Sequence, residues 1–258
     1  MNRYLPLVLL IVSTLMLGAC TTTSSKPALS DERLREASEL NAELGVKYMQ
    51  QGDNERAMGK LQKAIDQNED NARAHHYLGE LYRRVDRPEK AEQHFKEALD
   101  ITPKDPSLLN NYAVLLCDLE KYEASDRNFE KALDDPVYSG KAGIYENMGQ
   151  CAETRNNLRQ AEEYYLKALR LDPELPIANL GMARLTFDMS LYGQSRNYLE
   201  RALEQRKHNA QSLWLSILLE RQAGNRNKVT RYAMLLKERF PDSEETRKLR
   251  KLERQGKL

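Results

Sequence analysis

Small and large apolar side chains recur along residues 38–243 at a nearly constant spacing. One column is mostly alanine, a second mixes alanine with serine, and a third holds mostly leucine or an aromatic residue. Successive members are 34, 34, 36, 34 and 34 residues apart in all three columns, which are Ala64, Ala98, Ala132, Ala168, Ala202 and Leu236; Ala57, Ala91, Ser125, Ala161, Ser195 and Val229; and Leu61, Phe95, Phe129, Tyr165, Leu199 and Ala233. Agreement of three columns on one period predicts a repeat protein.

Each repeat has room for two antiparallel helices joined by a short turn. Residues 51–54 read as such a polar turn, and Pro103, Pro173 and Pro241 stand where proline ends a second helix. Stacked pairs predict an all-α solenoid in which small residues let the two helices approach closely. We expect repeats at 38–71, 72–105, 106–139, 142–175, 176–209 and 210–243, a first helix capped by Ser30, and a capping helix at 244–258.

The N-terminus reads as an export signal. Asn2 and Arg3 precede an apolar run from Leu5 to Leu17, which is too short to span a bilayer as a helix. The stretch Leu17-Gly18-Ala19-Cys20 resembles the bacterial lipobox, in which the cysteine receives lipid and the leader is removed. We expect residues 1–19 to be a lipoprotein signal peptide, Cys20 to be lipidated, and 20–30 to be a flexible tether. The alternative is an ordinary secreted protein cut at the same place.

Charge and composition argue against several classes of function. Removal of residues 1–19 takes away one arginine and no acid, which leaves 39 basic and 39 acidic side chains. A net charge of zero argues against nucleic-acid binding and against electrostatic attachment to anionic lipid. We find no catalytic constellation, glycine-rich phosphate loop or serine elbow, and therefore expect no enzyme activity, small-molecule substrate or cofactor beyond the lipid.

Histidine and cysteine are sparse in the predicted mature chain. The four histidines show no partner at metal-ligand spacing, so we expect no metal site; they are His75, His76, His94 and His208. Besides Cys20, the chain has two cysteines in about 240 residues, which are too few for a disulfide framework. Cys117 and Cys151 fall inside predicted helices, where we expect each to serve as a small buried apolar side chain.

The repeat resembles the tetratricopeptide repeat (TPR). The resemblance rests on the three columns and on a small residue followed three positions later by a large one, which recurs at Gly45–Tyr48, Gly79–Tyr82 and Ala113–Leu116. The resemblance implies a right-handed superhelix of about six repeats, whose first helices line an inner groove through the second, fifth, sixth, ninth, twelfth and thirteenth residues of each unit. Carried onto this chain, those positions predict a partner-binding groove formed by Val46, Met49, Arg73, His76, Tyr77, Arg83, Asn110, Asn111, Val114, Asn147 and Gln150.

Several of these residues allow two interpretations. Asn110, Asn111 and Asn147 suit pairing with a peptide backbone, but hydrogen bonding between helices explains them equally well. Val46 and Met49 beside Tyr77 form an apolar strip for a partner, or pack against a helix at 31–37. A clamp for a C-terminal carboxylate, known in some relatives, would need Lys and Asn where Ala42 and Val46 stand.

Trp214 also allows two interpretations. It is the only tryptophan and occupies the fifth position of the sixth repeat. It either anchors a partner or forms a plug under the capping helix, and we favour the plug.

The whole mature chain resembles a narrower family, the type IV pilus biogenesis lipoproteins called PilF or PilW. The resemblance rests on residues 109–113, 120–124, 146–149 and 239–243, and on a lipobox, a tether and six repeats in that order. It implies a non-enzymatic pilotin that binds the pilus secretin and promotes its outer-membrane localisation and multimerisation. Thr21, in place of aspartate, resembles lipoproteins sorted to the periplasmic face of the outer membrane. The alternatives are a scaffold for outer-membrane protein assembly or periplasmic enzyme complexes, and a regulator of peptidoglycan enzymes.

Overall fold

The computed structural model describes residues 30–204 and 208–256, which fold into thirteen α-helices with no strand among them. The predicted signal peptide, Cys20 and all of the tether except Ser30 lie outside these residues. No helix in the described part has the length and apolar character to span a membrane. The helices are α1 (Asp31–Gln50), α2 (Asn54–Gln67), α3 (Ala72–Arg84), α4 (Pro88–Ile101), α5 (Pro106–Asp118), α6 (Tyr122–Leu133), α7 (Lys141–Thr154), α8 (Leu158–Leu171), α9 (Pro176–Asp188), α10 (Tyr192–Glu204), α11 (Ala210–Gln222), α12 (Arg226–Arg239) and α13 (Glu244–Arg254).

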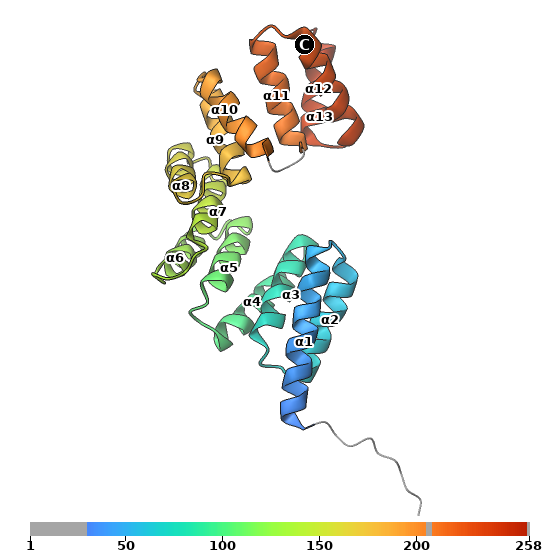
Figure 1. The fold of residues 1–258 in the computed structure, drawn as a ribbon, viewed down its shortest axis with the longest axis vertical. Coiled ribbons are helices and arrows are strands. Elements are labelled where there is room, and N and C mark those ends of the chain that lie inside the picture. Colours follow the sequence, from blue (N-terminus) through green and yellow to red (C-terminus); the bar gives the residue numbers. More distant parts are fainter. Residues whose placement is uncertain (1–29, 205–207, 257–258) are drawn as a thin grey trace, which may run out of the picture.

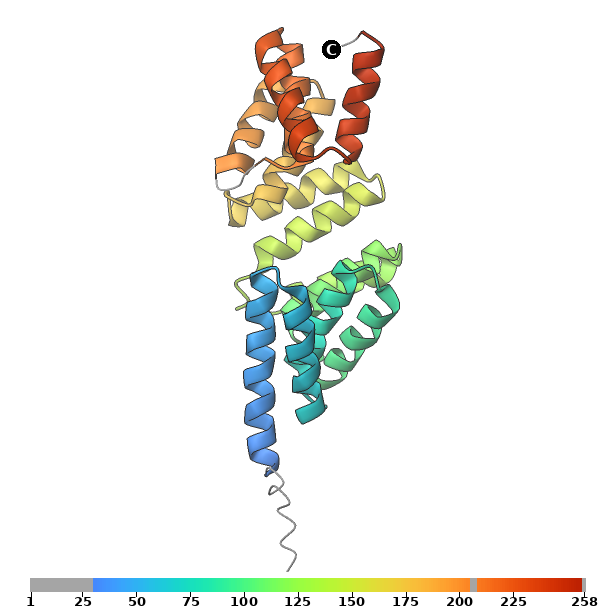
Figure 2. The same cartoon turned by 90° about the vertical axis from the view of Figure 1, so that its right-hand side faces the viewer.

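Consecutive helices form six antiparallel pairs, from α1 with α2 to α11 with α12, and α13 packs on the last pair. The pairs stack into a curved solenoid, with α1–α4 at one end and α11–α13 at the other (Figure 1). A side view shows α1 and α13 at opposite ends of the long axis (Figure 2). The predicted all-α solenoid of helix pairs is confirmed. We call α1, α3, α5, α7, α9 and α11 the first helices of the pairs.

Within a helix pair, a glycine on one helix faces a large side chain on the other, and this lets the two helices approach closely. A Cβ built on Gly45 would lie 2.6 Å from Leu61, and one on Gly149 would lie 2.5 Å from the ring of Tyr165. Tyr165 is fully buried, and Gly181 of the next repeat faces the other side of its ring. The aromatic ring therefore fills the space that two glycines leave between α7, α8 and α9, and holds neighbouring repeats together.

The same substitution at two glycines should change stability in opposite directions. Gly149→Ala forces a methyl group against the buried Tyr165 ring, and we expect it to lower the free energy of unfolding by about 1–3 kcal/mol. Gly59 lies within α2 with nothing within 4 Å of its added Cβ. Gly59→Ala should therefore raise that free energy by about 0.5–1 kcal/mol through helix propensity. Urea unfolding followed by circular dichroism compares the two, and a loss in both variants or in neither would contradict this account.

Local sequence explains where the helices begin and end. Gly52 turns the chain from α1 to α2 with a φ of +79°, and the Asp53 side chain accepts a hydrogen bond from the Arg56 N–H at the start of α2. Ser30 stands at the N-cap position of α1, although its side chain makes no capping hydrogen bond. Residues 31–37 form the first turns of α1 itself. The expectation of a separate helix there, packed against Val46 and Met49, is therefore wrong, because all of them belong to one straight helix.

Candidate functional site

A groove runs along the first helices. Three recesses of about 510, 540 and 250 Å³ follow one another from α3 to α13. Gln150, Thr154 and Ile177 line both the first and the second, while Arg184 and Gln211 line both the second and the third. Because neighbouring recesses share walls, we treat them as one surface and call it the groove. A separate recess of about 550 Å³ lies near the turns before α5 and α7, and none of the predicted partner-binding residues lines it.

Five of the eleven predicted residues line the first recess: Arg83, Asn111, Val114, Asn147 and Gln150. Asn110 is half-buried and hydrogen-bonds to two of these residues. Arg73 is exposed near the start of α3 and outside the lining of the recesses. That the lining residues bind a partner stays a prediction.

The remaining predicted residues belong to the packing of the first two repeats. Met49 is 7% exposed in a cluster with Ala42, Leu61 and Leu78, and Tyr77 packs against the same cluster. Val46 is half-buried on α1. His76 is 6% exposed, and its ring stacks on the Tyr77 ring with centroids 4.9 Å apart. Part of the predicted apolar strip of Val46, Met49 and Tyr77 therefore belongs to the hydrophobic core of the first two repeats.

Hydrogen bonds from Asn147 to His76 link three first helices in one chain. The Asn147 amide donates to the Asn110 Oδ1 at 3.1 Å, and Asn110 donates to Asn111 at 3.2 Å. The Asn111 amide then donates to Nε2 of His76 at 2.9 Å. Burial lowers the pKa of His76, which keeps the ring neutral and able to accept at pH 7. We call this chain the amide ladder; it ties α7 to α5 and α5 to α3.

Arginines bridge the first helices at the groove surface. Arg83 of α3 donates to both oxygens of Glu80 at 3.1 Å and to Asp118 of α5 at 3.0 Å. Arg184 of α9 donates to Glu153 of α7 and to Gln211 of α11. Each of these two arginines is therefore balanced by a carboxylate.

The carboxyl group of Glu80 makes the stability contributed by this network depend on pH. Burial raises the pKa of its carboxyl group, but hydrogen bonds and charge from Arg83 and Arg84 outweigh burial, so the pKa lies below its ordinary value. A lowered folded-state pKa adds stability above the ordinary value of 4.5, and this contribution is lost as the pH falls through the folded-state pKa.

Glu80→Gln should lower the free energy of unfolding by about 1–2 kcal/mol at pH 7, because Arg83 loses a charged acceptor. The difference from the unsubstituted protein should shrink as the pH falls below about 4. Urea titrations from pH 7 to pH 3 measure both effects. The exposed Glu130→Gln serves as the matched control and should stay within about 0.5 kcal/mol. A gap for Glu80→Gln that is independent of pH would contradict the assignment.

A disulfide joins Cys117 of α5 to Cys151 of α7, with a Cα–Cα distance of 5.9 Å. The expectation that the two cysteines are separate apolar side chains is therefore wrong. The count of cysteines excludes a framework of several bridges, but it says nothing about one bridge between stacked helices. Both residues line the first recess, so the covalent link forms part of the groove and spans the junction that carries two extra residues.

Apart from Trp214, considered as a possible partner anchor, the predicted groove positions end in the fourth repeat, although the same signal continues into the fifth and sixth repeats. The positions applied to the first four repeats, carried two repeats further, include most of the lining there: Ile177, Leu180, Arg184, Phe187, Asp188, Gln211, Trp214, Leu215 and Leu218. Trp214 is half-buried, packs against the cluster that contains Leu249 of α13, and also lines the third recess. It thus contacts the core beneath the capping helix while one face stays in the groove.

Comparison with known proteins shows which proteins the chain resembles. TPR family models match residues 48–110 and 142–175. The type IV pilus assembly protein PilF of Pseudomonas aeruginosa is 29% identical over 226 residues, which is 88% of this chain and 90% of PilF. A solved structure of P. aeruginosa PilF superposes with a TM-score of 0.71 at 29% identity, over 84% of this chain and 98% of that one. The chain is a TPR protein that is similar to PilF and PilW.

The crystal structure of PilW supports the same resemblance. This structure, described as that of a widely conserved type IV pilus biogenesis factor, superposes with a TM-score of 0.68 at 27% identity over 82% of this chain and 97% of PilW. The family resemblance drawn from the sequence is confirmed. Because the match extends over nearly the whole of both relatives, it concerns the complete set of repeats.

Proposed function

We propose that this protein acts in type IV pilus biogenesis as a non-enzymatic pilotin that binds the pilus secretin and promotes its assembly in the outer membrane. The observation that carries the proposal is the similarity to PilF and PilW over nearly their full lengths. The groove supports a binding role, because its polar groups are arranged along an extended track with apolar side chains such as Val114 and Ile177 between them. An extended or helical segment of polypeptide suits such a surface.

The groove leaves specific groups for a partner. Gln150 is exposed at the boundary of the first two recesses, and the side chain of Asp118 is 52% exposed beside Arg83. The amide ladder and the arginine bridges hold the surrounding side chains in place. A partner would therefore meet a largely pre-organised surface, which reduces the entropy cost of binding.

The outer-membrane part of the proposal rests on the N-terminal sequence and on the disulfide. Cys20 in its lipobox context would carry the lipid, and Thr21 fits sorting to the outer membrane. A disulfide between Cys117 and Cys151 is typical of an oxidising compartment such as the bacterial periplasm. All three features agree with a protein tethered at the periplasmic face of the outer membrane.

The test is an immunoblot of heat-resistant secretin multimers in outer-membrane fractions, with and without the gene for this protein. An unrelated β-barrel porin is probed on the same membrane. The proposal predicts that the multimer is lost while the porin is unchanged. Loss of both would indicate general outer-membrane protein assembly, and loss of neither would contradict a pilotin.

A further inference from the structure

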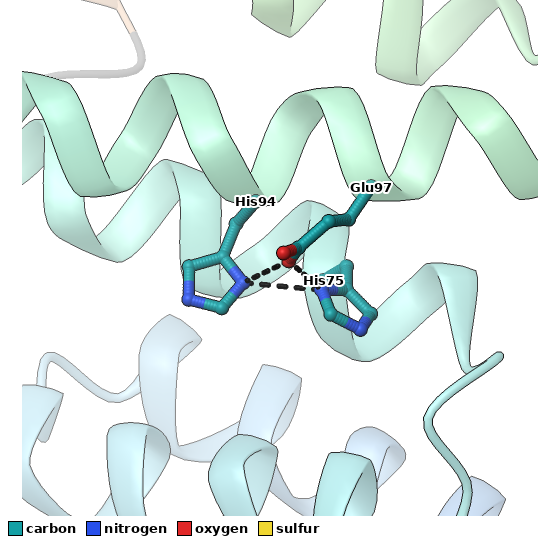
Figure 3. Close-up of side chains that lie close together, drawn as sticks. All are labelled: His75, His94 and Glu97. Atoms are coloured by element: carbon teal, nitrogen blue, oxygen red, sulfur yellow. Dashed lines mark hydrogen bonds and ion pairs between the residues drawn. The ribbon is translucent and has the colours of Figure 1, made fainter.

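His75, His94 and Glu97 converge between α3 and α4, outside the groove (Figure 3). The His75 Nδ1 lies 3.1 Å from the His94 Nδ1 and 2.8 Å from the Glu97 Oε2, and His94 Nδ1 lies 3.2 Å from that oxygen. Sequence spacing missed the cluster because His75 is on a different helix from the other two. The antiparallel packing of α3 and α4 brings the three side chains together.

The hydrogen bonds around His75 direct a lone pair into the cluster. Its Nε2 lies 3.0 Å from the backbone oxygen of Glu69, which can only accept, so Nε2 carries the proton. In a neutral imidazole the Nδ1 is then an acceptor, and it faces a carboxylate oxygen that is also an acceptor. Two acceptors 2.8 Å apart need a cation between them, either a proton or a metal ion.

The second layer of contacts matches the way metal ligands are held in proteins. A histidine that binds metal through one nitrogen commonly donates from the other to a backbone carbonyl, as His75 does to Glu69. The amide of Gln93 holds the second oxygen of Glu97 at 2.9 Å, which leaves Oε2 turned toward the histidines. The His94 ring stacks on Tyr82 with centroids 5.4 Å apart and an interplanar angle of 6°.

We propose that His75, His94 and Glu97 form a binding site for a divalent transition metal, with Zn²⁺ as the reference ion. Two imidazoles and a carboxylate are ligands that zinc takes, at about 2.0–2.2 Å. Tetrahedral bonds of that length separate the ligand atoms by about 3.3 Å, close to the observed 2.8–3.2 Å. The side chains of Glu97 and His94 are 38% and 16% exposed, so an ion can enter from solvent and keep water as a fourth ligand.

Such an ion would fasten the two helices of the second repeat to each other. Through the carbonyl of Glu69 it would also fix the turn from α2 to α3, and hence the step from the first repeat to the second. The site is independent of the proposed pilus role, since none of its three ligands lines the groove.

The test uses the untagged protein, purified in detergent and stripped with EDTA, because a histidine tag would itself bind zinc. Calorimetric titration with ZnCl₂ should give one ion per chain. Glu97→Gln and His94→Gln should weaken binding by more than about 100-fold, which is the upper end of what loss of an outer contact alone causes. His208→Gln removes a half-buried histidine elsewhere and should leave the affinity unchanged.

Thermal unfolding separates loss of the site from loss of the fold. In EDTA the helical circular dichroism of Glu97→Gln should match that of the unsubstituted protein. Zinc should raise the unfolding temperature of the unsubstituted protein and of His208→Gln, but not that of Glu97→Gln. Equal binding or an equal temperature rise in Glu97→Gln, or no binding by the unsubstituted protein, would overturn the proposal.

Discussion

Replacing both Cys117 and Cys151 by alanine should lower the free energy of unfolding by about 3–4 kcal/mol. The bridge closes a loop between residues 34 positions apart, and a loop of that length loses about that much chain entropy in the unfolded state. For a chain of this size the unfolding temperature should fall by about 10 °C. The loss should be local, because in a solenoid each repeat contacts only its neighbours and this bridge spans the third and fourth. Hydrogen exchange should therefore rise most in α5 and α7.

A reductant separates the covalent bond from the packing of the two sulfurs. Reduction of the unsubstituted protein should reproduce most of the destabilisation, while the same treatment of the double alanine variant should change nothing. If reduction leaves the unfolding temperature unaltered although both thiols become free, the bridge does not stabilise the junction.

Replacing Cys20 by alanine should remove the protein from the outer-membrane fraction while leaving its helical fold intact. The proposed anchor consists of acyl chains, each methylene of which contributes about 0.8 kcal/mol, and the balanced charge of the mature chain offers no electrostatic substitute. Secretin multimers in the outer membrane should fall to the level of the deletion strain. Membrane fractionation and the immunoblot described above measure the two effects.

Thr21→Asp provides the matched control, because it keeps the lipidated cysteine and changes only the residue after it. We expect this variant to remain lipidated but to fractionate with the inner membrane, and to support few secretin multimers. If Cys20→Ala still places the secretin in the outer membrane, lipid-borne delivery is wrong even though the binding role would survive.

The repeat fold was predictable because packing imposes the same demand on every repeat. A large side chain such as Leu61 or Tyr165 fits only where the facing residue is small, so the columns keep their character through six units. The turns between paired helices repeat with the same steps of 34 and 36 residues, and each has one residue with positive φ. Those residues are Gly52, Asp86, Glu120, Asn156, Ser190 and Gly224. Their varied identities hide the turn from sequence, because polar residues as well as glycine adopt this conformation there.

The helix positions that line the groove were predictable from the sequence, but the hydrogen bonds among their side chains were not. Helical periodicity places Asn111 and Asn147 on the surface of the first helices, yet it does not show that each would hydrogen-bond to the preceding repeat. Such bonds depend on the offset between stacked helices. Of the two interpretations of Asn110, Asn111 and Asn147, the structure shows the hydrogen bonds between helices, while pairing with a partner stays a prediction.

The disulfide was not predictable from the sequence for a related reason. Cys117 is the twelfth residue of its repeat and Cys151 is the tenth of the next, so the two do not occupy equivalent positions. Comparison of equivalent columns pairs Cys117 with Glu153 instead. Only the three-dimensional stacking of α5 on α7 brings the two sulfurs together.

The central claim, that the groove of the first helices receives the pilus partner, is tested most directly by site-specific photocrosslinking in cells. A photoreactive residue at Gln150 stands in the groove, and one at Arg127, exposed on α6, stands outside its lining. We expect ultraviolet light to link the secretin to the Gln150 position and not to the Arg127 position. A crosslink from Arg127 in the absence of one from Gln150 would place the partner on the outer surface and contradict the account.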